Sequence, residues 1–184
     1  VRCMPQVFGA IENVLNHARE TLSAALNGVT DNPLIFDDAI LSGGNFHAQP
    51  LAFISDYLAI AAGEVASMSE RRTDSPVRPV TPALSMFLTT EPGLESGFMI
   101  AHVTAAALTS ENRTLAHPAS IDNVTTSAGQ EDHVSMAPWA GFKLQRICDN
   151  TANVLAIALL AAPHAIHKMQ PLQTTEPLQR VHAF

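Results

Sequence analysis

The clearest helical pattern in the 184-residue sequence lies in residues 50–72, PLAFISDYLAIAAGEVASMSERR. Apolar residues recur there at alternating steps of three and four, the spacing of one face of an α-helix. The positions are Leu51, Ile54, Leu58, Ala61, Val65 and Met68. A seam that continues over about three heptads is typical of helices that pack lengthwise against other helices. The segment therefore predicts an all-α protein built from long helices.

Three further long helices are expected, at residues 5–27, 94–115 and 134–162. Pro5 can open the first, Gly28 can end it, and Pro163 can end the last. The proline-rich residues 73–93 should form a loop, and residues 34–36 and 40–41 a short hairpin. We therefore predict one helical domain over residues 1–184, an elongated bundle with a small hairpin insertion and a mixed tail at 163–184.

The composition excludes several classes of protein. Hydrophobic residues make up 47% of the chain, charged residues 15%, and the net charge is −7. Nucleic-acid binding needs clustered Lys and Arg, so we expect no such partner. No uninterrupted apolar run approaches the roughly 18 residues of a membrane span, so we expect no membrane association. Two cysteines are too few for a disulfide framework, which favours a cytoplasmic protein with reduced thiols.

The chain begins with Val1 instead of Met, and its first residues already look like part of a working segment. We therefore expect it to be a piece of a longer polypeptide. The helix expected at 94–115 is apolar nearly all round, so we also expect contacts with other subunits to cover it.

Two polar clusters interrupt the helical pattern. They are Gly43-Gly44-Asn45-Phe46-His47 and Thr126-Ser127-Ala128-Gly129-Gln130-Glu131-Asp132-His133. A helical scaffold does not need such clusters, and polar groups of this kind are costly to bury without partners. Because both fall at helix junctions, they suggest one site assembled from distant parts of the chain.

Each cluster also has an ordinary interpretation. The first can be a tight turn in which Asn45 and His47 satisfy local backbone groups. In the second, Asp132 fits the N-cap of the following helix. That interpretation leaves the adjacent Gln130 and Glu131 unexplained, and a carboxylate there could hold an imidazole or a cationic group.

Three single residues are further candidates for a site. Arg2 has a planar guanidinium suited to a carboxylate, although a terminal arginine is most often a solvated charge. Asn32 lies in an Asp-Asn-Pro turn and Met99 in an apolar helix, where a turn former and a core residue are the usual interpretations. His164 and His167 have no carboxylate or cysteine clustered with them, so we expect no metal site.

Eight short strings are spread over most of the chain. They are RCMPQV (2–7), TDNPL (30–34), SGGNFH (42–47), SERR (69–72), SGFMI (96–100), SEN (110–112), LAHPAS (115–120) and QEDHVSM (130–136). In this order they resemble the C-terminal part of the aromatic amino-acid ammonia-lyases and aminomutases, most of all the histidine-specific branch. Only the tail after about Ala162 matches poorly. The resemblance implies a helical bundle like that of the fumarase and aspartase superfamily.

The resemblance also implies a reaction. Family members form an electrophilic 4-methylidene-imidazol-5-one group autocatalytically from an Ala-Ser-Gly triplet. This group captures the amino acid, a base removes a β-proton, and ammonia leaves. In the histidine-specific branch the substrate is L-histidine and the product trans-urocanate.

The triplet that forms the electrophile does not occur in these 184 residues. The resemblance therefore implies that an N-terminal portion supplies it, as a separate chain or a missing segment, and that this chain alone is inactive. Family active sites are built from several subunits, so we expect a homo-oligomer, a tetramer.

Two residues take catalytic roles through the resemblance. Glu131 matches the carboxylate that contacts the imidazole or amine of the substrate. Phe46 matches the aromatic residue that packs beside the electrophile.

Four residues take substrate-binding roles in the same way. Arg2 matches the arginine that grips the substrate carboxylate, and Asn32 an amide near the same end. Met99 matches the position that meets the far end of the substrate ring, and Gln130 precedes the catalytic carboxylate.

Two positions favour histidine as the substrate. Relatives that act on phenylalanine usually carry Gln at the position of Glu131 and Lys at that of Met99.

Two alternatives to this function stay open. One is a tyrosine- or phenylalanine-directed lyase or aminomutase on the same scaffold. The other is a non-catalytic, truncated relative that serves as an oligomerisation subunit, which the missing triplet would suit.

Overall fold

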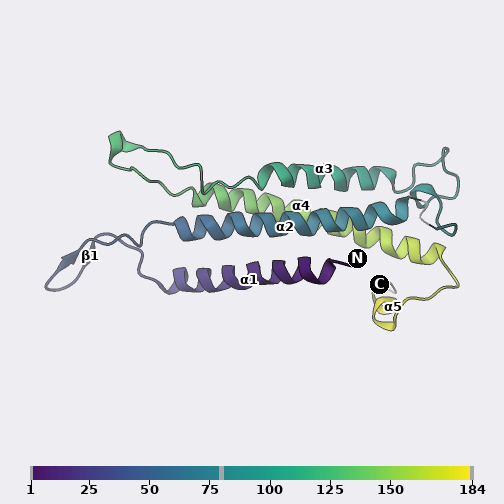
Figure 1. The fold of residues 1–184 in the computed structure, drawn as a ribbon, viewed down its shortest axis with the longest axis horizontal. Coiled ribbons are helices and arrows are strands. Elements are labelled where there is room, and N and C mark those ends of the chain that lie inside the picture. Colours follow the sequence, from purple (N-terminus) through teal and green to yellow (C-terminus); the bar gives the residue numbers. More distant parts are fainter. Residues whose placement is uncertain (1, 79–80, 183–184) are drawn as a thin grey trace. The chain divides into compact units, whose positions relative to one another are not determined.

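The computed structural model describes residues 2–78 and 81–182, and most of them are helical (Figure 1). The long helices are α1 (Met4–Asn27), α2 (Gln49–Val77), α3 (Met99–Leu115) and α4 (Ala137–Lys168), and a short α5 (Glu176–His182) follows. Two single 3-10 turns, η1 (Met86–Leu88) and η2 (Ser127–Gly129), lie in loops. The prediction of an all-α fold is confirmed.

The first helix and the hairpin lie where the sequence predicts them. Pro5 occupies the first turn of α1, where a residue without an N–H loses no helical hydrogen bond. At the other end, the N–H of Gly28 donates to the carbonyl of Ala25 (3.3 Å). β1 (Leu34–Ile35) and β2 (Ile40–Leu41) then pair as an antiparallel hairpin.

Four helix boundaries differ from the sequence prediction by more than two residues. α2 continues to Val77 and passes Arg72, so the predicted loop at 73–93 begins as helix. α3 begins at Met99 and not at Leu94. α4 begins at Ala137 and runs through Pro163 to Lys168, so the prediction that Pro163 ends it is wrong.

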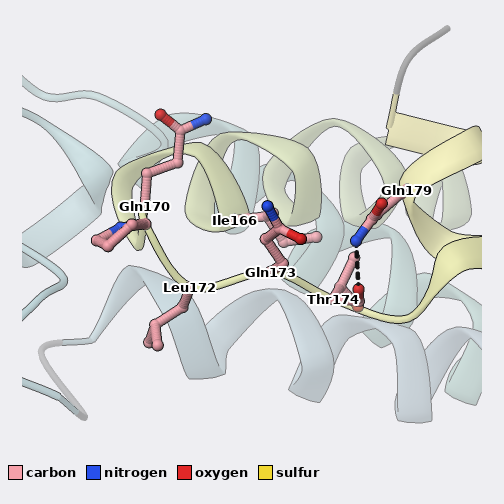
Figure 2. A pocket seen from close by; sticks show the side chains of 7 residues that line it. Ile166, Gln170, Leu172, Gln173, Thr174 and Gln179 are labelled. Carbon is pink, nitrogen blue, oxygen red and sulfur yellow. Dashed lines mark hydrogen bonds between the residues drawn. The ribbon is translucent and has the colours of Figure 1, made fainter.

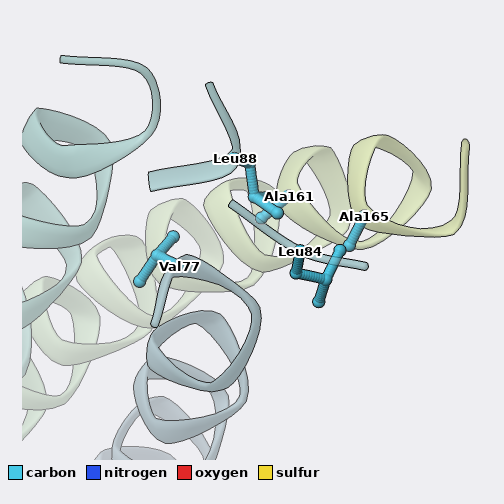
Figure 3. Packing of buried hydrophobic residues seen from close by; sticks show 5 residues of the cluster. All are labelled: Val77, Leu84, Leu88, Ala161 and Ala165. Carbon is cyan, nitrogen blue, oxygen red and sulfur yellow. The ribbon is translucent and has the colours of Figure 1, made fainter. Parts of the chain in front are cut away.

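α4 continues past Pro163 because side chains on both sides of the proline are buried. A proline in a helix interior costs about 3 kcal/mol, since it removes one backbone N–H and crowds the preceding turn. Ala161 and Ala165 flank it and belong to one apolar cluster (Figure 3). The other buried members are Val77, Leu84 and Leu88. Burial of this apolar surface favours the continued helix.

α3 begins late because the residues before it turn toward η1. The N–H of Phe98 donates to the carbonyl of Phe87 (2.9 Å), and Gly97 has a φ of 48°, which is outside the right-handed helical region. A Cβ atom at Gly97 would lie 2.4 Å from the Phe87 carbonyl oxygen, so only glycine fits there.

Residue contacts divide the chain into two compact units. Unit 1 comprises Val1–Ala62 and Thr114–Cys148, and unit 2 comprises Gly63–Arg113 and Asp149–Phe184. In unit 1, α1 lies beside the first half of α2 (Figure 1), where Leu58 lines a surface groove together with Leu15 and Leu22. Unit 2 holds the cluster of Figure 3 and a second one made by Ala66, Ala105 and Val154.

A buried carboxylate in α2 organises the charges of unit 2. Glu70 is 3% exposed and accepts hydrogen bonds from Nε of Arg71 (2.5 Å) and Nε2 of His102 (2.8 Å). Burial tends to raise the pKa of Glu70, but the hydrogen bonds and charges of Arg71 and His102 outweigh it and hold that pKa below the ordinary value of 4.5.

This lowered pKa predicts a loss of stability in acid. The unfolded chain binds a proton at Glu70 more readily than the folded chain, so this stabilising contribution is complete above pH 4.5 and is lost as the pH falls through the folded pKa. The free energy of unfolding should drop by up to about 1.4 kcal/mol per pH unit for each proton taken up. Urea denaturation at pH 7, 4 and 3 measures it. Glu70→Gln should flatten the dependence, and an equally steep fall in that variant would contradict the assignment.

Within the described residues, one helix, α2, is long and apolar enough to cross a membrane by length and composition alone. A core helix of a soluble protein satisfies the same criterion, and a third of the apolar window is buried. The buried carboxylates Asp56 and Glu70 lie on this helix, and they pair with the cationic side chains of Lys143 and Arg71. This pairing favours a helix that packs inside a bundle.

Candidate functional site

Two loops of unit 1 carry the residues of the two polar clusters. One connects α1 to α2 and contains the hairpin, and the other connects α3 to α4. In Figure 1 both extend beyond the helix ends on the left. Because both loops, residues 28–48 and 116–136, lie within unit 1, their side chains can contribute to one site.

Asn32 holds the first loop together through one of its two polar atoms. Its Oδ1 accepts hydrogen bonds from the N–H of Gly43 (2.9 Å) and the hydroxyl of Ser42 (3.2 Å). Within residues 2–78 and 81–182, its Nδ2 has no hydrogen-bond partner. The fixed oxygen orients the amide, and the NH₂ group is left as a donor that could meet a carboxylate.

Phe46 lines a cavity between the end of α1 and the start of α2. The cavity has a volume of about 370 Å³. Thr21, Ala24, Ala25, Pro50 and Leu51 contribute to its wall. The Phe46 ring is 54% exposed, although aromatic rings are usually well buried. An exposed ring at the edge of an apolar cavity can pack against a planar ligand.

Glu131 lies near the tip of the second loop, whose two arms are joined to each other. The N–H of Val134 donates to Oδ1 of Asn123 (2.8 Å), and the hydroxyl of Thr125 donates to the carbonyl of Asp132 (3.3 Å). The next pair outward, Thr126 and Glu131, forms an antiparallel bridge (2.9 and 3.3 Å).

The tip between these arms has an unusual backbone. Ser127, Ala128 and Gly129 have positive φ angles of 53°, 55° and 88°. Residues other than glycine rarely adopt this conformation, and such strain is most often found at functional sites. The side chains of Gln130 and Glu131 are exposed. The arrangement holds a carboxylate and an amide outward on a well-defined loop.

His47 connects the two loops. Its Nε2 lies 2.8 Å from the carbonyl oxygen of His133, and the two imidazole rings are 5.4 Å apart at an angle of 30°. Asn45, two residues earlier, donates to the carbonyl of Val29 (2.7 Å). His47 satisfies a local backbone group as expected, since it accepts from the N–H of Gln49 (3.2 Å). Asn45 instead bonds a residue 16 positions away, and His47 also bonds one 86 positions away.

A buried ion pair supports the base of the second loop. Oδ2 of Asp56 accepts from the N–H of Ser120 (2.7 Å), and its Oδ1 lies 3.5 Å from Nζ of Lys143. Lys143 also donates to the carbonyl of His117. Asp56 and Lys143 are 4% and 6% exposed. Burial tends to raise the pKa of Asp56, but backbone hydrogen bonds from Ser120 and Ala119 and the charge of Lys143 hold it below 3.8.

The structure joins the loops that carry two of the predicted site residues and separates other predicted residues. The loops of Phe46 and Glu131 are joined by His47 and His133. Arg2 is exposed in the turn before α1. Asn32 lies beyond the other end of this 24-residue helix, about 36 Å away at about 1.5 Å per residue. One copy of the chain therefore does not place Arg2 and Asn32 on the same small ligand. Met99 is the half-buried first residue of α3, in unit 2.

A second cavity lies in unit 2, between the end of α4 and α5 (Figure 2). Its volume is about 340 Å³, and Gln179 donates across it to the carbonyl of Thr174 (2.7 Å). Its lining is Ile166, Gln170, Pro171, Leu172, Gln173, Thr174 and Gln179, with no ionisable side chain among them. General acid–base chemistry needs such a group, so the loops of unit 1 are the better candidate site.

Three residues of this region were not predicted as site residues from the sequence. They are Asp56, Lys143 and His133. For the first two a signal exists, because each is a charge within an otherwise apolar helical stretch, which points to a buried partner. The part of the chain that the structure describes has no group of three or more His, Cys, Asp or Glu residues able to hold a metal ion.

A family model described as aromatic amino acid lyase matches residues 1–184. The chain is 52% identical over 186 residues to the histidine ammonia-lyase of Aromatoleum aromaticum, covering 100% of this chain and 35% of that protein. It therefore spans about a third of the length of the curated relatives that it matches.

Two solved structures are similar over nearly the whole chain. The crystal structure of histidine ammonia-lyase from Trypanosoma cruzi has a TM-score of 0.93 and 45% sequence identity, covering 100% of this chain and 37% of that chain. The tyrosine aminomutase from Streptomyces globisporus has a TM-score of 0.89 and 34% identity, covering 99% and 35%. The chain is thus more similar in sequence to these two histidine ammonia-lyases than to this tyrosine aminomutase.

Proposed function

The chain belongs to the aromatic amino acid lyase family, and on this premise we propose that it is the C-terminal part of a histidine ammonia-lyase. Such an enzyme eliminates ammonia from L-histidine and releases trans-urocanate. The observation that carries the proposal is the joining of the Glu131 loop to the Phe46 loop through His47 and His133. The higher identity to the histidine ammonia-lyases than to the aminomutase supports this substrate.

The proposed roles follow from the chemistry of each group. The exposed Glu131 carboxylate accepts a proton or a hydrogen bond from the imidazole or amine of the substrate. Phe46 packs its ring against the planar reacting groups. Gln130, beside Glu131, donates to the substrate from the same loop.

Three more residues orient the amino acid. The guanidinium of Arg2 binds the substrate carboxylate through a planar pair of N–H donors. The Nδ2 group of Asn32 donates to the same carboxylate, and Met99 contacts the far edge of the imidazole. These groups hold the substrate so that its β-proton faces a base.

The electrophile must come from residues outside this chain, because the 184 residues contain no Ala-Ser-Gly triplet. A 4-methylidene-imidazol-5-one group formed from that triplet would supply the carbon that makes the amine a leaving group. The exposed ring of Phe46 and the apolar cavity beside it fit a planar group of this kind. We propose that an N-terminal portion, as a separate chain or a further segment, provides it, and that this chain by itself does not convert histidine.

The distance between Arg2 and Asn32 favours a site shared among subunits. If both bind one carboxylate, they come from different copies. Large apolar side chains exposed on the helices, such as Leu26 (83%) and Leu160 (67%), supply surface for such contacts. A homotetramer in the cytoplasm is the proposed assembly.

A complementation assay tests the proposal. The chain is co-expressed with the part of the Aromatoleum aromaticum relative that precedes the matched region, and the purified assembly is given histidine, tyrosine or phenylalanine. Urocanate and ammonia should form from histidine, and replacing the triplet serine by alanine should abolish both. A preference for tyrosine or phenylalanine would contradict the proposed substrate and favour the alternative, a tyrosine- or phenylalanine-directed lyase or aminomutase.

The missing triplet also favours a second candidate, a non-catalytic subunit. In that case an assembly would form but would convert none of the three amino acids. Mass analysis of the native complex separates the candidates, because the lyase requires a further portion of roughly twice this length that carries Ala-Ser-Gly, either as a co-purifying chain or as part of the same polypeptide.

A further inference from the structure

The loop that carries Glu131 is joined to the rest of its unit in an unusual way. Three pairs of hydrogen-bonded residues join its arms to each other. Within residues 2–78 and 81–182, a single hydrogen bond joins residues 123–134 to another segment, the one between His47 and the His133 carbonyl. A loop with internal hydrogen bonds that is held, apart from its two chain ends, by one hydrogen bond to another segment can move as a body when that bond is lost.

The hydrogen bonds of His47 determine its tautomer. A carbonyl oxygen only accepts, so Nε2 carries the proton that is donated to His133 (2.8 Å). Nδ1 lies 3.2 Å from the N–H of Gln49 and accepts from it, so it carries none. The ring therefore uses both nitrogens, one on the first turn of α2 and one on the second loop.

We propose that His47 is a positioning residue for the reaction, a role that rests on the proposed function. Phe46 is its neighbour in sequence, and Glu131 lies two residues before the carbonyl that it holds. One imidazole thus determines where the carboxylate stands relative to the aromatic ring. His47 does not touch the substrate. It acts through Glu131, since a displacement of about 1 Å in a catalytic group can lower turnover about 10²-fold.

Two substitutions separate the two hydrogen bonds. In His47→Asn, the amide oxygen can replace Nδ1 and accept from Gln49, but the side chain is too short to reach His133. In His47→Gln, the amide NH₂ can replace Nε2 and donate to His133, while the bond to Gln49 is lost. A residue needed only to cap α2 would tolerate Asn better, whereas a residue that positions the loop would tolerate Gln better.

The experiment measures kcat, KM and hydrogen exchange in the complemented assembly. His47→Asn should lower kcat about 10²-fold. It should also speed amide exchange in residues 124–134 up to about tenfold, the opening expected from the loss of one hydrogen bond. His47→Gln should restore most of both. Equal kcat in the two variants, or a lower value in Gln, would overturn the proposal.

The exchange measurement keeps this inference separate from the proposed function. If the parent assembly converts no amino acid, the proposed function fails and the exchange rates alone test the attachment of the loop. Faster exchange in His47→Asn with parent-like exchange in His47→Gln would still establish it. Unchanged exchange in both would overturn it.

Discussion

Replacing Glu131 by Gln should lower kcat/KM for histidine by about 10²–10⁴-fold, the usual contribution of a positioned proton acceptor. Glutamine has nearly the same shape as glutamate, but it cannot accept a proton at neutral pH. The backbone groups of Glu131, not its side chain, form the bridge with Thr126, so the loop should keep its shape. Because the side chain is exposed, the free energy of unfolding should change by less than about 0.5 kcal/mol. Steady-state urocanate formation by the complemented assembly measures the loss.

Asp132→Asn provides a matched control for this experiment. It removes a carboxylate one residue further along the same exposed loop, so it changes the net charge equally. Its kcat/KM should stay within about threefold of the parent, since an exposed charge has a weak effect over such distances. Normal histidine turnover in Glu131→Gln would contradict the role assigned to Glu131. An equal loss of kcat/KM in Glu131→Gln and Asp132→Asn would contradict it as well.

Hydrophobic spacing predicted most of the fold. The prediction was wrong where tertiary contacts outweigh a local signal. The seam from Leu51 to Met68 predicted α2, and its continuation to Val77 depends on the packing of Val77 with the α4 residues Ala161 and Ala165. Those contacts also carry α4 past Pro163. Proline is a strong local signal, but no local pattern states which side chains will be buried around it.

The sequence pointed to the two loops of the candidate site but not to the contacts that connect them. The two polar clusters stood out because they interrupt apolar helices, and both lie on loops of unit 1. The bond from His47 to His133 joins residues 86 positions apart, and no spacing rule predicts such a pair. The separation of Arg2 from Asn32 follows from the length of α1, and the sequence pattern did predict that length.

Lys143→Met should destabilise the protein by about 3–5 kcal/mol, the range for a buried ion pair that loses one partner. Asp56 would stay buried as an anion with the N–H of Ser120 but without a cation, and the His117 carbonyl would lose its donor. The midpoint of urea denaturation at pH 7, with the slope held constant, measures the change. Replacement by Met of the cation in an exposed ion pair is the control. In Arg180→Met, which breaks the pair with Glu176, the loss should be below about 1 kcal/mol.

The double variant Asp56→Asn/Lys143→Met tests whether the uncompensated charge causes the loss. Asparagine keeps an oxygen acceptor for the N–H of Ser120 and carries no charge, so the double variant should be more stable than Lys143→Met alone. A double variant as unstable as the single one would assign the loss to packing of the lysine stem instead. Since Ser120 and His117 lie at the base of the loop that carries Glu131, the destabilised single variant should also turn over histidine more slowly than Arg180→Met. The buried pair would then stabilise the bundle and position the loop that carries Glu131 through the same contacts.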